Sequence, residues 1–108
     1  MMPSRPDFRD TVRARADRDP AFREALFQEA VSALPRGEVD DCRAGLRAYI
    51  NATIGFEAPS KALGRPSKSP MRMLGPSGNP TAENLLGVIG VLRAETGVQF
   101  DVRVVAAE

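Results

Sequence analysis

ALGRPSKSPMRMLGPSGNPTAENLLGVIGVL, residues 62–92, is the stretch that decides the fold. Gly64 predicts the end of one short helix, because glycine readily adopts the left-handed conformation that follows a helix. A second short helix is predicted over residues 67–74, and residues 75–80, GPSGNP, contain too many helix breakers to be anything but a loop. Thr81 then predicts the N-cap of a longer helix that runs up to Gly97, with core-spaced residues Leu85, Val88, Ile89 and Leu92.

More helices are predicted upstream of this stretch. A short one is expected over residues 7–16, where an apolar residue recurs every fourth position, and Asp19-Pro20 predicts a capped start of the next, which ends at residues 35–37. The third should be the central core helix, since a single stripe holds Val39, Cys42, Leu46, Tyr49, Ile50 and Thr53. Residues 56–63 predict a two-turn helix in which Pro59 is expected to remove one backbone hydrogen bond.

The C-terminal segment VQFDVRV, residues 98–104, alternates apolar and polar residues with the period of a half-buried strand. One face of this strand would carry Val98, Phe100, Val102 and Val104. A lone strand leaves backbone donors and acceptors unpaired, so we expect it to pair with the same strand of a second copy in a homodimer. The predicted fold is thus mainly α, with five to six helices and a short C-terminal strand.

Composition limits both the organisation and the chemistry. The 108 residues support a single folded unit, divided into an N-terminal helical extension (1–37), a central domain (38–97) and a strand with its tail (98–108). The absence of histidine and the single cysteine, Cys42, exclude zinc fingers, Cys–His nucleophiles and an internal disulfide, and we expect no metal or cofactor. Cys42 is interpreted as a small buried hydrophobe rather than a reactive thiol. With no signal peptide or membrane-spanning run in this sequence, we expect a cytoplasmic protein that does not enter a membrane.

The predicted order of short helix, turn, short helix, loop and long helix is the layout of a helix-turn-helix domain. If Ser67 caps the second short helix, Met71 and Leu74 should point inward and leave Lys68, Ser69 and Arg72 outward. Those residue types contact phosphates and guanine edges, and the formal net charge of +1 means that DNA contact must come from such a local patch. The DNA-binding residues predicted in this way are Ser67, Lys68, Ser69 and Arg72. A plain helical bundle with exposed lysine and arginine would show a similar pattern.

The run YINATIGFEAPSKALGRPSKSPMRMLGPSGNPTAENLLGVIGVL, residues 49–92, closely resembles the addiction-module antidote family, the HigA-type antitoxins. The resemblance extends from about Phe8, through DPAFREAL, to QFDVR, and its most specific parts are YINATIGFE, RPSKS and MRMLGPSGNPTA. It implies an Xre-like helix-turn-helix fold, a toxin partner of the RelE/ParE superfamily, and dimers that repress their own operon through operator DNA. The family usually has leucine where this chain has Pro59 and Pro70.

Two other functions compete with an antitoxin. A stand-alone transcriptional regulator would have the same helices and no toxin partner. An enzyme would have to use Glu38, Asp40 and Asp41, but acidic residues are expected at the start of a helix, and GPSGNP lacks the Gly-Lys-Ser/Thr ending of a nucleotide-binding loop. We therefore expect no enzymatic activity. The basic residues of the first helix, Arg13, Arg15 and Arg18, are interpreted as a solvated face, with toxin binding as the alternative.

Overall fold

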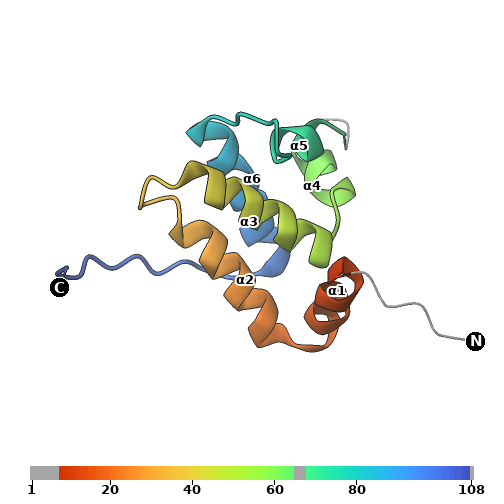
Figure 1. The fold of residues 1–108 in the computed structure, drawn as a ribbon, viewed down its shortest axis with the longest axis horizontal. Helices are drawn as coiled ribbons and strands as arrows, with labels where there is room; N and C mark the ends of the chain where they lie inside the picture. Colours follow the sequence, from red (N-terminus) through yellow and green to blue (C-terminus); the bar gives the residue numbers. More distant parts are fainter. Residues whose placement is uncertain (1–7, 65–67, 108) are drawn as a thin grey trace, which may run out of the picture.

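A computed structural model describes residues 8–64 and 68–107, and for residues 8–10 and 68 it describes the backbone only. This part of the chain forms six helices and no strand (Figure 1), which confirms the all-α class. The helices are α1 (Phe8–Arg18), α2 (Pro20–Ser32), α3 (Val39–Ala52), α4 (Glu57–Ala62), α5 (Lys68–Met73) and α6 (Ala82–Thr96). No helix among the residues described is long and apolar enough to cross a membrane.

The predicted helix boundaries at Asp19 and Thr81 are confirmed. The Asp19 carboxylate accepts a hydrogen bond of 3.2 Å from the backbone N–H of Phe22, with Pro20 as the first residue of α2. Thr81 Oγ1 likewise accepts from the N–H of Asn84 at 3.1 Å. Each side chain satisfies a donor that has no partner inside the helix. At its other end α6 stops at Gly97, whose φ of 72° lies in the left-handed region.

Helix α3 is the centre of the molecule, as its apolar stripe predicted. It packs against both α1 and α2, and the side chains of Cys42, Leu46 and Ile50 are completely buried. Burial raises the pKa of the Cys42 thiol, so the group stays neutral and fits its interpretation as a packing residue. The inclusion of Val39 in the buried stripe was wrong. It is the first residue of α3 and is exposed, because the helix begins outside the core.

The core joins the helices on both sides of residue 37. Phe27 of α2 stacks on Tyr49 of α3, with ring centroids 4.7 Å apart. Leu74 and Leu85 are completely buried in the same cluster, which also receives half-buried Val98. Helix α2 therefore shares one core with the helices that follow it.

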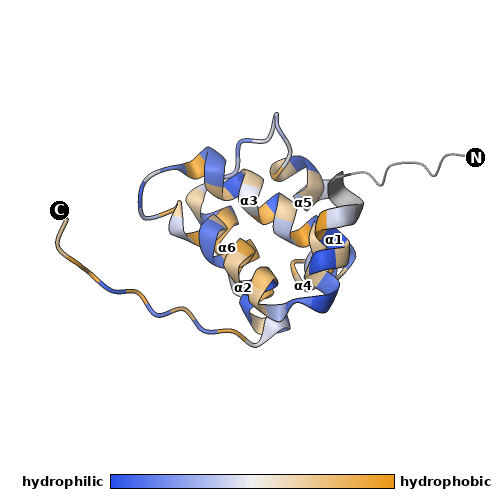
Figure 2. Cartoon of the chain, turned by 60° about the horizontal axis from the view of Figure 1, so that its bottom comes forward, coloured by the Kyte–Doolittle hydropathy of each residue, from blue (hydrophilic) through white to orange (hydrophobic). Residues whose placement is uncertain are grey.

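The strand expected at the C-terminus is not formed within the chain. Residues 98–107 run as an unpaired tail that leaves the body on the side away from α4 and α5 (Figures 1 and 2). The physical reason is that a strand requires a neighbouring strand, and the described residues of one copy provide none. The start of the tail is anchored nevertheless, because the Phe100 ring meets Phe27 edge-on at 5.1 Å.

Candidate nucleic-acid interface

Helix α4 is the first of two short helices joined by a turn at Gly64. Pro59 is its third residue, and the first N–H groups of a helix have no partner within the helix. The expectation that Pro59 removes a hydrogen bond was therefore wrong, and leucine at this position would restore none. The proline ring is instead fully buried, next to Ser60, whose hydroxyl donates to the carbonyl of Phe56 at 2.5 Å.

Helix α5 faces the core through Pro70, and Leu74, the residue that directly follows the helix, points to the same side; both are completely buried. These residues are four apart and so lie on one face of the helix. The prediction for Leu74 is confirmed, whereas the prediction that Met71 points inward was wrong, since Met71 is 43% exposed. Apolar character favoured methionine, but the proline ring fills the inward position one residue earlier. Gly64, with a φ of 68°, provides the predicted left-handed turn before α5.

The outer side of α5 presents Arg72, which is exposed as predicted. Ser69 is half-buried and so lies at the edge of this surface. The predicted contacts of Ser67 lie outside the described residues, as does the side chain of Lys68, although Lys68 is the first residue of α5. Of the four predicted DNA-binding residues, Arg72 is therefore the one placed with its side chain exposed on α5.

Arg43 of α3 fixes the end of α5, and the sequence pattern did not identify it. Its Nη1 donates to the carbonyl oxygens of Leu74 at 2.7 Å and of Gly75 at 2.8 Å. Its Nε also donates to the exposed carboxylate of Asp40 at 3.3 Å. The end of a helix leaves carbonyls without intrahelical partners, so the guanidinium both satisfies such carbonyls and ties α5 to α3. An arginine beside core residue Cys42 was the only signal in the sequence, and it is a weak one.

Replacing Arg43 by methionine is expected to lower the free energy of unfolding by about 2–3 kcal/mol, since two hydrogen bonds to a charged donor are lost. The Leu74 carbonyl then has no donor, whereas the Gly75 carbonyl keeps the N–H of Gly78. Methionine preserves most of the apolar stem. Urea denaturation followed by circular dichroism measures the change. Asp40→Asn is the matched control and should cost less than about 1 kcal/mol, because that ion pair is exposed to solvent. Equal effects of the two changes would contradict the role given to Arg43.

The loop after α5 folds back over the end of this helix. The N–H of Gly78 donates to the carbonyl of Gly75 at 2.9 Å. A Cβ atom at residue 78 would lie 2.1 Å from the carbonyl oxygen of Met73 and 2.5 Å from that of Arg72. Only glycine allows this close approach of the two backbone segments. The breaker-rich run 75–80 therefore closes α5, as well as connecting it to α6.

The carboxylates considered for catalysis lie at the start of α3. Asp40 is engaged by Arg43, Asp41 is exposed in the first turn of α3, and the Glu38 side chain makes no capping bond. Within the part of the chain that the structure describes, no group of three potential metal ligands occurs.

Comparisons with known proteins add no assignment: no family model, no curated protein and no solved structure matches this chain.

Proposed function

We propose that the chain is the antitoxin of a type II toxin–antitoxin system and that it represses its own operon as a homodimer in the cytoplasm. In this proposal α4 and α5 are the two helices of an Xre-like helix-turn-helix, and α5 enters the major groove of operator DNA. The observation that carries the proposal is the exposed Arg72 on a short helix whose opposite face is anchored in the core by Pro70 and Leu74.

The local geometry supports DNA binding in three ways. The inward pair fixes the rotation of α5, so the outer face has a defined orientation. Arg43 holds the end of the helix, which limits its movement relative to α3. Arginine bonds the O6 and N7 atoms of guanine through two donors, so a single well-placed Arg72 can discriminate between bases.

The toxin partner rests on the resemblance of residues 49–92 to HigA-type antitoxins. On α1, Arg15 lies over the Phe22 ring at 4.4 Å and 3.8 Å from the carboxylate of Asp19. Arg13, Arg15 and Arg18 are all exposed, and we propose these three arginines of α1 as candidates for toxin contact. In this proposal the chain acts by binding DNA and a toxin protein, and it catalyses no reaction.

The test of DNA binding uses fluorescence anisotropy with duplexes that tile the region upstream of the gene, against a scrambled duplex of equal composition. At 150 mM salt we expect one upstream segment to bind at least about a thousandfold more tightly than the scrambled duplex. Equal affinity for all duplexes would overturn the proposal.

Co-expression with the adjacent reading frame tests the proposed toxin partner. If the adjacent gene product arrests growth and co-expression of this chain relieves the arrest, the result supports an antitoxin. An adjacent gene product that is harmless and does not co-purify with this chain favours a stand-alone regulator.

A further inference from the structure

We infer that the C-terminal tail pairs with the tail of a second copy as an antiparallel two-stranded ribbon whose twofold axis passes through Val102. This register specifies how the two copies of the proposed homodimer are joined. It is inferred from the tail and its surroundings and does not depend on DNA or toxin binding. In it, residue 101 lies opposite residue 103 of the second copy, and residue 100 opposite residue 104.

The tail carries an apolar face that its own chain does not cover. Val102 is 83% exposed and Val104 is 101% exposed, although Val98 and Phe100 on the same side of an extended chain contact the core. Figure 2 shows the alternation of hydrophobic and hydrophilic residues along the tail. Such a segment also has unpaired backbone donors and acceptors, which an added strand would satisfy.

Charge complementarity favours a second copy as the occupant and favours this register. Asp101 and Arg103 are two residues apart and both point to the polar side of an extended chain, where their side chains meet at 3.1 Å. An axis through Asp101 would place two carboxylates opposite each other, and an axis through Arg103 would oppose two guanidinium groups. With the axis through Val102, each Asp101 faces an Arg103 of the other copy, so the tail is complementary to itself.

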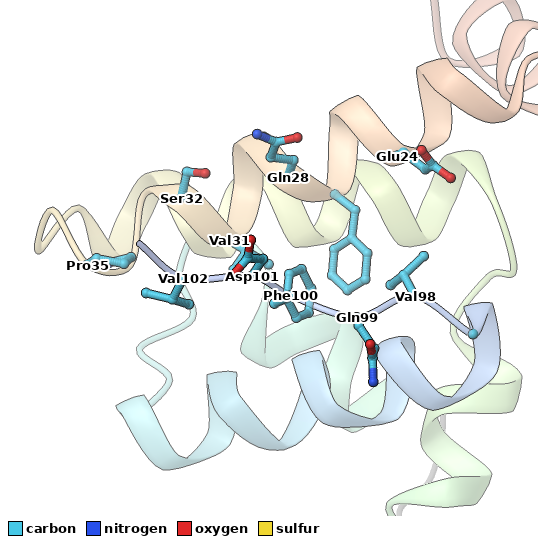
Figure 3. Close-up of a pocket in the computed structure, with 12 residues that line it drawn as sticks. Glu24, Gln28, Val31, Ser32, Pro35, Val98, Gln99, Phe100, Asp101 and Val102 are labelled. Atoms are coloured by element: carbon cyan, nitrogen blue, oxygen red, sulfur yellow. The ribbon is translucent and has the colours of Figure 1, made fainter. Parts of the chain in front are cut away.

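The surroundings of the tail accommodate this arrangement. A groove of about 750 Å³ lies between α2 and the tail, and Phe27, Val31 and Phe100 are part of its apolar lining. Figure 3 shows the tail running along α2, from Val98 near Glu24 to Val102 near Pro35. The register places Val104 of the second copy opposite Phe100, and hence beside this groove. Because the tail leaves the body away from α4 and α5, the pairing keeps α5 of both copies open.

Charge exchange tests the register without DNA, so its result is independent of the proposed function. Arg103→Asp and Asp101→Arg should each weaken the dimer at least about tenfold, because each replaces two attractive cross-strand pairs by two repulsive ones. The double exchange, D101R with R103D, should restore the dissociation constant to within about threefold of the original. Analytical ultracentrifugation measures the three constants. Arg93→Asp applies the same charge change at an exposed position of α6 and should leave the dimer unchanged.

Each outcome decides the inference. A wild-type chain that stays monomeric at 100 µM, roughly the range of weak dimers, would overturn it. A dimer whose dissociation constant does not change with the single exchanges would also overturn it, because the interface would then lie elsewhere. A double exchange that fails to restore the dissociation constant would overturn it as well. Thermal melting at a concentration where all variants are monomeric checks that they fold, and we expect no change there because both side chains are exposed to solvent. Restoration by the double exchange supports the register directly.

Discussion

Replacing Gly78 by alanine is expected to lower the free energy of unfolding by about 3 kcal/mol, the upper part of the range for a forced steric overlap. The new Cβ atom would lie 2.1 Å from the carbonyl oxygen of Met73, so the loop has to separate from the end of α5. Backbone atoms lie on both sides of the contact and neither can rotate away. Chemical denaturation measures the loss of stability. In amide hydrogen exchange, the substitution should increase the exchange rate more at residues 71–78 than in the rest of the chain.

Gly90→Ala is the matched control for this substitution. Gly90 is exposed in α6, and no atom lies within 4 Å of the place that an added Cβ would occupy, so alanine should stabilise the helix by up to about 1 kcal/mol. If Gly78→Ala were as stable as the original protein, the close approach of the loop to α5 would be refuted.

Gly45→Ala is expected to cost about 2 kcal/mol, although alanine is the better helix former. Gly45 lies where α3 crosses α2, and a Cβ atom there would approach the Ala30 Cβ to 2.8 Å and the Ala30 Cα to 3.0 Å. The added methyl group must push the two helices apart and loosen the stacking of Phe27 on Tyr49. Loss of near-ultraviolet circular dichroism from these rings would accompany the lower midpoint of urea denaturation.

A second change identifies the cause of this loss. Ala30→Gly in the Gly45→Ala background removes the shorter contact, so the double variant should lose less stability than the two single effects added together. A double-mutant cycle measures this coupling. Strict additivity of the two changes would contradict a close crossing of α2 and α3 at these residues.

Much of the helical fold could be predicted because its signals are local. Asp19, Thr81 and Gly97 mark helix ends through their own hydrogen bonds and backbone preferences, and the 3.6-residue period of α3 marks its buried face. Errors arose where a few tenths of a turn decide the outcome. The rotation of α5 buries Pro70 in place of Met71, and α4 begins late enough, at Glu57, to place Pro59 in its first turn without a lost hydrogen bond.

The candidate site was only partly predictable. Arg72 is local to its helix, so spacing was enough to place it outward. The contacts of Arg43 with the end of α5 span 31 and 32 positions of sequence, and no periodicity encodes such a pair. The tail is a different case, because its alternation is visible in the sequence while its pairing depends on a second molecule.

The most direct test of the central claim, that the exposed face of α5 reads DNA, is the effect of Arg72→Ala on operator affinity. The titration uses the best upstream duplex at fixed salt, with Arg13→Ala as a control that removes the same charge from α1. We expect Arg72→Ala to cost about 1–3 kcal/mol of specific binding and Arg13→Ala to cost little, with unchanged melting temperatures for both. Unchanged affinity in the Arg72 variant, or equal losses in the two variants, would contradict the account.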